Sequence, residues 1–164
     1  MVEAEAMAEQ KTTTLNFPRF GEFTFAEDEV FTFPWGLPGF PQHSRWIALN
    51  LDSQMNFVWL QSLDDLNVAI PTIDPWMVFE NYDPKLPPYA FVTLEIREAG
   101  EFAVLCVVVA TAAAEEMTMN LLAPIVVNLR NRKGRQIMLE NSHYSVREPM
   151  PRKDQASAVR PAAS

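Results

Sequence analysis

The 164-residue sequence predicts a mostly β protein: a single-domain antiparallel barrel-like fold with at most one or two short helical turns. Short segments rich in Val, Ile, Thr and aromatic residues recur along the chain, separated by Pro, Gly, Asn or Asp. Repeated short strands of this kind favour an antiparallel barrel or sandwich. Thirteen prolines argue against long helices, because each proline fixes φ and removes a backbone donor.

The individual elements follow from local patterns. Polar and aromatic residues alternate at 21–25 and 31–33, and the later segments are richer in Val, Ile and Leu. Helical turns are expected at 62–65, where Ser62 resembles a cap, and at 112–122, which holds good helix formers. The predicted strands are 21–25, 31–33, 46–51, 57–60, 91–96, 102–110, 125–129 and 136–139.

Three regions are expected along the chain. Residues 1–14 are acidic and polar and predict a disordered leader. Residues 15–147 carry the strand-like segments and predict one β-barrel domain. Residues 148–164 are rich in Ala, Ser, Pro and charge and predict a flexible basic tail.

Charge and cysteine content limit the functional classes. Residues 17–129 hold 15 acids and 4 bases, whereas residues 130–164 hold 8 bases and 3 acids. An acidic body repels phosphate backbones, so direct nucleic-acid binding is disfavoured and a basic protein partner is favoured. We predict a cytoplasmic protein without membrane contact. The chain has a single cysteine and no signal-peptide pattern, and its apolar runs are shorter than the ~20 residues of a membrane helix.

Catalytic chemistry is not indicated, and no cofactor or metal is expected. His43 and His143 lie far apart in sequence, and no nucleotide-binding or hydrolase motif is present. Cys106 lies among Leu and Val residues, which predicts an inert core thiol. The carboxylates of Asp64 and Asp65 are expected to bond backbone N–H groups in a turn.

Three segments stand out against this background. Residues 33–40 combine two prolines and two glycines with large apolar side chains, so they predict a loop tucked over one end of the barrel. Its side chains serve either as a structural plug or as an apolar binding patch. Asn120 and Asn128 bracket an apolar segment, where their amides are expected to close turns. Residues 130–136 predict a hairpin turn with Gly134 at a positive φ.

Several of these stretches, in this order, resemble the FliW family. They are F-P-W-G-L-P-G-F at 33–40, L-Q-S-L-D-D at 60–65, N-L-L-A-P-I-V-V-N at 120–128 and R-K-G-R-Q at 132–136. The opening R-F-G-E at 19–22 and the closing N-S-H-Y-S-V-R at 141–147 match the same pattern. The region 86–101 matches it poorly. The resemblance spans roughly residues 17–147.

The resemblance implies a barrel-like protein without cofactors that binds flagellin and the translational repressor CsrA. Such a protein acts as a flagellar assembly factor that antagonises CsrA, either competitively or allosterically. We place the partner surface on the loop and on the 120–128 segment, and the predicted contact residues are Trp35, Leu37, Pro38, Phe40, Asn120, Leu121, Pro124 and Asn128.

The alternative function is a small-ligand-binding β-barrel. Such a barrel requires an open lumen lined by aromatic side chains. The candidate lining residues are Phe23, Phe25, Trp46, Trp59 and Phe91.

Overall fold

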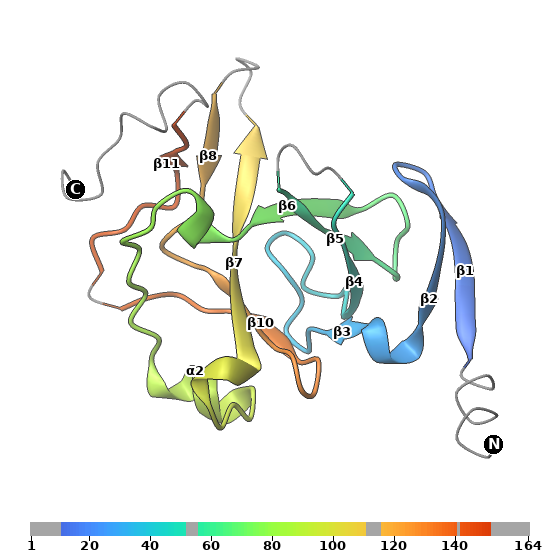
Figure 1. Ribbon diagram of the computed structural model, residues 1–164, viewed down its shortest axis with the longest axis horizontal. Helices are drawn as coiled ribbons and strands as arrows, with labels where there is room; N and C mark the ends of the chain where they lie inside the picture. The colour runs from blue at the N-terminus through green and yellow to red at the C-terminus, as the bar shows by residue number, and fades with distance from the viewer. Residues whose placement is uncertain (1–10, 52–55, 111–115, 141, 152–164) are drawn as a thin grey trace.

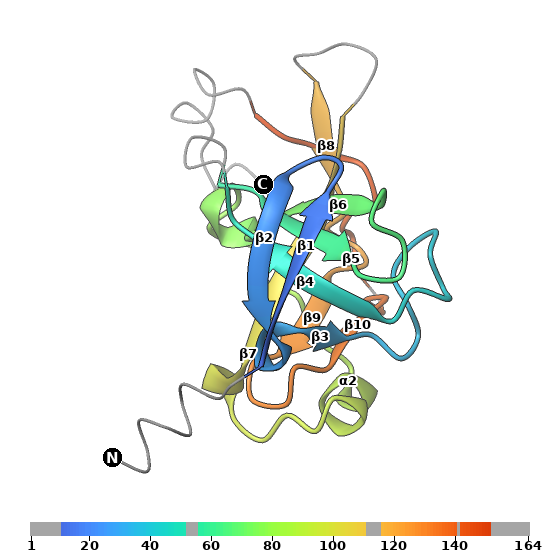
Figure 2. The same ribbon diagram turned by 90° about the vertical axis from the view of Figure 1, so that its right-hand side faces the viewer.

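The computed structural model describes residues 11–51, 56–110, 116–140 and 142–151. It confirms a mostly β, antiparallel fold, in which a two-stranded hairpin accompanies a nine-stranded sheet (Figures 1 and 2). The hairpin consists of β1 (Thr12–Phe17) and β2 (Gly21–Ala26). The larger sheet contains β3 (Phe31–Thr32), β4 (Arg45–Leu49), β5 (Val58–Ser62), β6 (Ala69–Ile73), β7 (Phe102–Ala110), β8 (Met117–Met119), β9 (Ile125–Asn128), β10 (Gly134–Gln136) and β11 (Glu148–Pro149).

Helical structure is short in the described part of the chain. One α-helix, α2 (Pro88–Thr93), lies beside the sheet (Figure 1). Three 3-10 turns complete the set: η1 (Glu27–Glu29), η2 (Pro75–Met77) and η3 (Ala99–Glu101). None of the described helices has the length and apolar character needed to cross a bilayer.

The larger sheet curls until β3 meets the turn that leads into β10. Its order is β10-β9-β7-β6-β5-β4-β3. In addition, β8 pairs with the second half of β7, and β11 pairs with β8. Thr32 of β3 forms a parallel bridge with Lys133, and the Thr32 N–H donates to the Arg132 carbonyl at 2.8 Å. We call this junction the seam. Because it is a single bridge rather than a ladder, the sheet is barrel-like and not a fully closed barrel.

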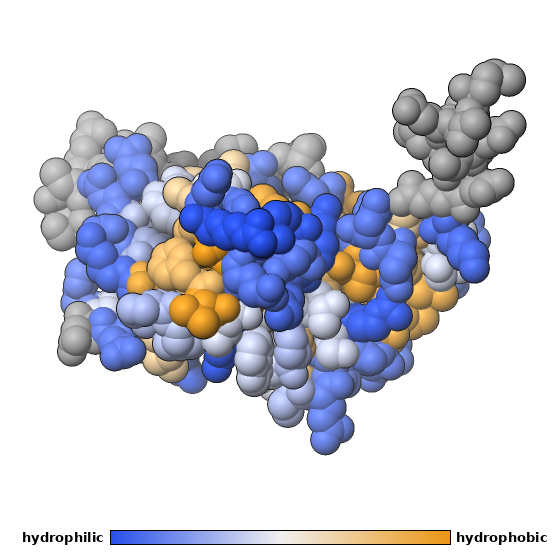
Figure 3. All heavy atoms as spheres, turned by 90° about the horizontal axis from the view of Figure 1, so that it is seen from below, coloured by the Kyte–Doolittle hydropathy of each residue, from blue (hydrophilic) through white to orange (hydrophobic). Residues whose placement is uncertain are grey.

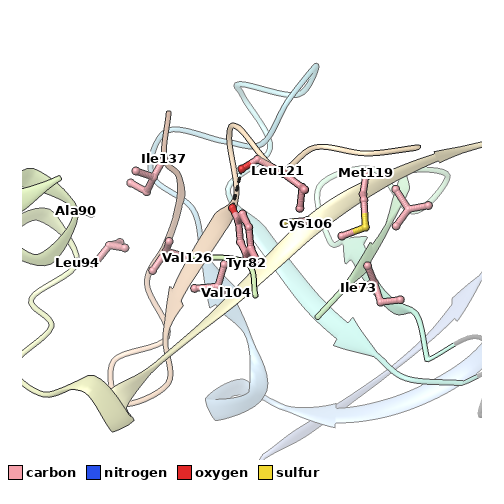
Figure 4. Packing of buried hydrophobic residues seen from close by; sticks show 11 residues of the cluster. Ile73, Tyr82, Ala90, Leu94, Val104, Cys106, Met119, Leu121, Val126 and Ile137 are labelled. Carbon is pink, nitrogen blue, oxygen red and sulfur yellow. Dashed lines mark hydrogen bonds between the residues drawn. The ribbon is translucent and has the colours of Figure 1, made fainter. Parts of the chain in front are cut away.

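Three apolar clusters hold these strands together. The largest contains Leu94, Cys106 and Ile137 and lies between β7 and the segments that cover it (Figure 4). The second cluster packs around Phe33 and Trp46, and a third joins the hairpin to β4. The loop at 33–40 therefore contributes to the core, since Phe33 is fully buried.

The strand predicted at 91–96 is wrong, because residues 91–93 lie in α2 and residues 94–95 form the turn that follows it. Pro88 occupies the first turn of the helix, where its fixed φ is favourable and no N–H is needed. Ala90 and Leu94 lie four residues apart and are both fully buried, which is the period of a helix. The β-type composition of Phe91-Val92-Thr93 conceals this signal.

The helical stretch predicted at 112–122 is wrong in its described part. Residues 117–119 form β8, which pairs with the end of β7 through Val108 and Met119. Residues 111–115 lie outside the described residues. Intrinsic helix propensity is a weak effect, and pairing with an existing strand overrides it.

The strand predicted at 136–139 begins earlier, because β10 covers Gly134–Gln136. Beyond β10 the chain keeps isolated contacts with the preceding segment: the N–H groups of Ile137 and Leu139 donate to the carbonyls of Pro124 and Leu122. Four strands were not predicted: β1, β6, β8 and β11.

The ends of the predicted domain shift outward. β1 begins at Thr12, inside the predicted leader, and pairs with β2 from Thr12 to Phe17. β11 lies at Glu148–Pro149, inside the predicted tail, and pairs with β8. Residues 1–10 and 152–164 lie outside the described residues, so the rest of the leader and tail stays a prediction.

Gly134 does not have the positive φ predicted for it. Arg132 takes that conformation instead, with φ of 63°. A Cβ added at Gly134 would overlap the ring of Phe33, so Gly134 is required for close packing rather than for backbone conformation. The seam thus depends on a large aromatic side chain lying against a residue without a side chain.

We predict that Gly134→Ala destabilises the fold by about 1–3 kcal/mol, because the added methyl group overpacks the Phe33 ring. Urea denaturation monitored by fluorescence measures the change. Gly100→Ala is the matched control, since no atom lies within 4 Å of its added Cβ. Combining Gly134→Ala with Phe33→Leu should cost less than the sum of the two single changes. Equal midpoints for Gly134→Ala and the parent chain would contradict the steric explanation.

Candidate protein-binding surface at the seam

Asn128 at the end of β9 fixes the turn that leads into β10. Its side-chain Nδ2 donates to the carbonyls of Leu94 and Glu95 at 2.8 and 3.3 Å. Its Oδ1 accepts the N–H groups of Arg130 and Asn131 at 2.8 and 3.4 Å. The fully buried amide therefore ties the turn at 128–133 to the end of α2. This confirms the prediction that Asn128 closes a turn by bonding backbone groups.

The backbone conformation of the loop at 33–40 requires its glycines. Leu37 and Phe40 exchange backbone hydrogen bonds of 3.2 and 2.8 Å across the Pro38-Gly39 pair. Gly39 has φ of 81°, which a tight turn with proline at its second position requires. Gly36 has φ of 71°, and a Cβ there would overlap the Phe40 carbonyl oxygen. The loop is thus a defined structure and not a loose connection.

The segment after β5 binds the backbone that follows this loop. Asp64 Oδ2 accepts the N–H groups of Ser44 and Arg45 at 2.8 and 3.1 Å. The Ser62 hydroxyl accepts the N–H groups of Asp64 and Asp65 at 3.0 and 3.1 Å. The predicted helical turn at 62–65 is wrong, since the chain only bends there. The prediction that the two carboxylates bond backbone N–H groups is confirmed, because Asp65 Oδ1 also accepts the Asn67 N–H.

Two of the four bases of the 130–135 turn form ion pairs. The Arg130 Nε donates to Glu101 at 3.2 Å, and its Nη2 donates to the Glu95 carbonyl at 2.8 Å. The Lys133 ammonium pairs with the Glu95 carboxylate at 2.8 Å. The hydrogen bond and charge of Lys133 lower the pKa of Glu95, and the backbone N–H of Arg97 lowers that of Glu101. These carboxylates are therefore ionised and neutralise two bases.

The other two bases lie on aromatic rings. The Arg132 guanidinium carbon is 4.7 Å from the centre of the Phe31 ring. The Arg135 guanidinium contacts both Trp35 and Tyr89, with distances of 4.1 and 4.9 Å to the ring centres. All three distances are within the range of favourable cation–π contacts. Arg135 thus joins β10, the loop and α2 at one point.

We define the seam surface as Trp35, Tyr89, Val92, Arg132 and Arg135. Trp35 is 47% exposed, Tyr89 37% and Val92 75%. Val92 follows Tyr89 by three positions in α2, so the two side chains are neighbours on the helix. Seen from below, strongly hydrophilic and apolar side chains adjoin on the face that α2 and β10 occupy (Figure 3). The surface combines exposed apolar groups with cations.

The predicted contact residues fall into two groups. Trp35 is exposed, and Pro38, Phe40 and Asn120 are half-buried. The remaining four side chains are buried in the fold: Leu37, Leu121, Pro124 and Asn128. Partner binding by these eight residues stays a prediction. The four buried side chains can contribute to a binding surface only by supporting the residues above them.

Asn120 and Leu121 have identifiable structural roles. Asn120 Oδ1 accepts the Ala123 N–H at 2.9 Å, which confirms the predicted turn. The Leu121 carbonyl accepts the buried Tyr82 hydroxyl at 2.6 Å (Figure 4). The 120–128 segment therefore belongs mainly to the frame beneath the surface.

Sequence reasoning missed Tyr89, Val92 and Arg135 as surface residues. Arg135 belongs to the basic stretch at 130–136, for which the sequence predicts only a hairpin turn. Tyr89 and Val92 belong to the region 86–101, in which the sequence singles out no motif. The Pro-Pro start of α2 is the available signal for a helix there, and a helix would have placed Tyr89 and Val92 on neighbouring positions.

The interior holds an inert thiol, as the sequence predicts. Cys106 is fully buried in the largest cluster, beside Tyr82 (Figure 4). Burial raises the pKa of the Cys106 thiol to about 12, and burial also raises the pKa of Tyr82. Across the described ranges, no three His, Cys, Asp or Glu side chains gather as metal ligands would.

The aromatic residues proposed for a ligand lumen do not share one cavity. Trp46 packs in the cluster beneath the loop, whereas Phe23, Phe25 and Trp59 belong to the cluster of the hairpin. Phe91 lies in α2 and contacts Phe102 edge-on, with ring centres 5.9 Å apart. The structure therefore gives the ligand-binding alternative no support.

Comparisons with known proteins agree on one family. The model of the FliW protein family matches residues 14–150. A flagellar assembly factor FliW from Thermosipho africanus is 36% identical over 133 residues, which cover 80% of this chain and 92% of that protein. One from Pseudothermotoga lettingae is 38% identical over 130 residues, covering 79% and 83%. The crystal structure of a flagellar assembly factor FliW superimposes with a TM-score of 0.74 at 27% identity, covering 84% of this chain and 95% of the other.

We predict that Asn128→Ala destabilises the protein by about 2–4 kcal/mol, because it removes all four hydrogen bonds that this fully buried amide makes to the end of α2 and to the turn. Asn120→Ala should cost only about 1 kcal/mol, because it removes one half-buried hydrogen bond. Thermal and urea unfolding of the two variants measure the difference. A larger loss for Asn120→Ala would show that the seam does not depend on Asn128.

We also predict that Cys106 resists Ellman's reagent in the native state at pH 8 and reacts at once in urea. The raised pKa makes a stabilising contribution that is fully present below the unfolded pKa of about 8.5 and is lost as the pH rises towards about 12. The stability of the parent chain should therefore fall more steeply over that interval than that of Cys106→Ala. Rapid native labelling would contradict the assignment of a desolvated thiol.

Proposed function

The chain belongs to the FliW family, and we propose that it is a flagellar assembly factor that binds other proteins in the cytoplasm and catalyses no reaction. The observation that carries the proposal is the extent of the family match, which covers residues 14–150. The stretches that carry the resemblance also converge in space. The chain on either side of the loop at 33–40 is held in place: the Ser44 N–H donates to Asp64, and the Thr32 N–H donates to the Arg132 carbonyl in the turn after Asn128. A rigid surface framed in this way suits recognition of a protein.

We propose flagellin and CsrA as the two partners, as the family resemblance implies. Flagellin is the filament subunit, and CsrA represses translation of flagellin messenger RNA. When secretion depletes flagellin, the freed chain captures CsrA and translation resumes. A switch of this kind requires a difference in affinity between states and no covalent chemistry.

The charge distribution supports a basic partner such as an RNA-binding repressor. Residues 17–129 hold 15 acids against 4 bases. The three acids of η1, Glu27, Asp28 and Glu29, are all exposed, and Glu27 forms an ion pair with Arg45. Opposite charges of this kind accelerate association more than they add affinity. The same acidic body opposes direct RNA binding.

We predict that the purified chain binds cognate flagellin and cognate CsrA, each with a dissociation constant in the micromolar range or below. Isothermal titration calorimetry measures both affinities, and stopped-flow fluorescence measures the rate of association with CsrA. That rate should fall as salt is added, because salt screens the attraction between exposed charges. Binding of neither protein at micromolar concentration would remove the partner assignment.

Titrating flagellin into a preformed complex with CsrA then defines how the two partners interact. Release of CsrA indicates mutually exclusive binding, and a ternary complex indicates separate sites. RNA added to the chain alone is the control for direct nucleic-acid binding. Strong, salt-dependent RNA binding by the isolated chain would contradict a mechanism that acts only through proteins.

A further inference from the structure

We propose that the seam surface binds an acidic, partly apolar segment of a protein partner and that Arg135 receives one of its carboxylates. The proposal rests on the proposed function in one respect, because it specifies the chemistry of a protein that the chain binds. The first observation is that the four bases in the 130–135 turn differ in whether a described carboxylate pairs with them. Arg130 and Lys133 are neutralised by Glu101 and Glu95. Within the described ranges, no carboxylate pairs with Arg132 or Arg135.

Arg135 is positioned to bind a carboxylate. Trp35 and Tyr89 both contact its planar guanidinium group, with ring centres 4.1 and 4.9 Å from the guanidinium carbon. A guanidinium donates its hydrogen bonds from its edge, within that plane, and its fork of N–H groups matches a carboxylate in a bidentate pair. Among the described residues, no carboxylate pairs with these donors. Because the side chain is already ordered, little conformational entropy is lost when a ligand binds.

Apolar groups surround this cation. Val92 is 75% exposed and Trp35 is 47% exposed, although both are large enough to contribute to a core. Val92 is next to Tyr89 on α2, and Tyr89 is in contact with Arg135. A ligand whose carboxylate meets Arg135 therefore has apolar surface beside it to cover. Aromatic and arginine residues are the types that most often dominate the binding energy of protein interfaces.

The charge balance favours an acidic peptide over a nucleic acid. Nucleic acids gain affinity by pairing many phosphates with many bases, and only two guanidinium groups of this turn lack a carboxylate. The surrounding body carries 15 acids against 4 bases, which repels a long phosphate chain. A short segment with one or two carboxylates meets the local cations and leaves the acidic body at a distance.

The test measures fluorescence anisotropy with three probes and the full chain. The probes are a fluorescein-labelled peptide of Leu, Phe, Asp and Glu, the same peptide with Asn and Gln in place of its acids, and labelled oligouridylate. We expect the acidic peptide to bind more tightly than the other two. Arg135→Lys should weaken that binding about 10-fold, because it retains the charge and loses the planar fork. Arg147→Gln, which removes an exposed arginine outside the seam surface, should leave it unchanged.

A pair of changes at Val92 tests the location without disturbing the fold, since this side chain is 75% exposed. Val92→Glu should weaken binding of the acidic peptide, and Val92→Lys should strengthen it. Equal affinity for the acidic and neutral peptides, tighter binding of oligouridylate, or identical behaviour of the two Val92 variants would overturn the proposal. A dimer of the parent chain that dissociates on Arg135→Lys would overturn it too, because a second copy would then occupy the surface.

The same variants separate this inference from the proposed function. Cognate flagellin and CsrA are titrated against the parent chain, Arg135→Lys and Val92→Glu. If the parent chain binds these proteins and neither variant changes any affinity, the inference is wrong and the proposed function stands. If the parent chain binds neither protein but still binds the acidic peptide through Arg135, the partner assignment is wrong and the inference stands.

Discussion

The arrangement at the seam depends on the side-chain amide of Asn128. Its nitrogen donates to carbonyls at the end of α2, and its oxygen accepts N–H groups of the following turn. The Leu94 and Glu95 carbonyls also accept from Asn131 Nδ2 and Arg130 Nη2, so several side chains of the turn join it to the end of α2. The Asn128 amide is fully buried, and its contacts satisfy backbone groups of both segments. These hydrogen bonds connect two segments that are far apart in sequence, and Arg135 contacts Tyr89 across the same pair of segments.

Much of the fold could be predicted from local patterns, and the errors have a common cause. The apolar run at 102–110 forms β7 with the predicted bounds, because its composition and its tertiary pairing agree. The segment 91–96 was assigned as a strand from its composition, although Pro88 and the burial of Ala90 and Leu94 determine a helix. In β8, pairing with β7 overrides helix-forming residues. The sequence alone does not show which neighbour a segment will have.

The candidate surface was predictable in part. The loop at 33–40 stood out because prolines, glycines and large apolar residues rarely occur together, and its Trp35 is indeed exposed. Arg135 was visible as a base, but its contacts with Trp35 and Tyr89 join three distant segments of the chain. Asn128 was correctly expected to close a turn, and its burial shows why it does not also present a surface. Contacts of this kind require the completed fold.

The bridge between Thr32 and Lys133 has a consequence for behaviour at high concentration. Strands at the margin of a sheet expose unpaired N–H and carbonyl groups, which recruit strands from other molecules and start aggregation. Here β3, at one end of the strand order, meets Lys133, the residue directly before β10 at the other end, and the Thr32 N–H is already bound to the Arg132 carbonyl. Joining these two margins removes a site at which a second copy of the chain could add a strand.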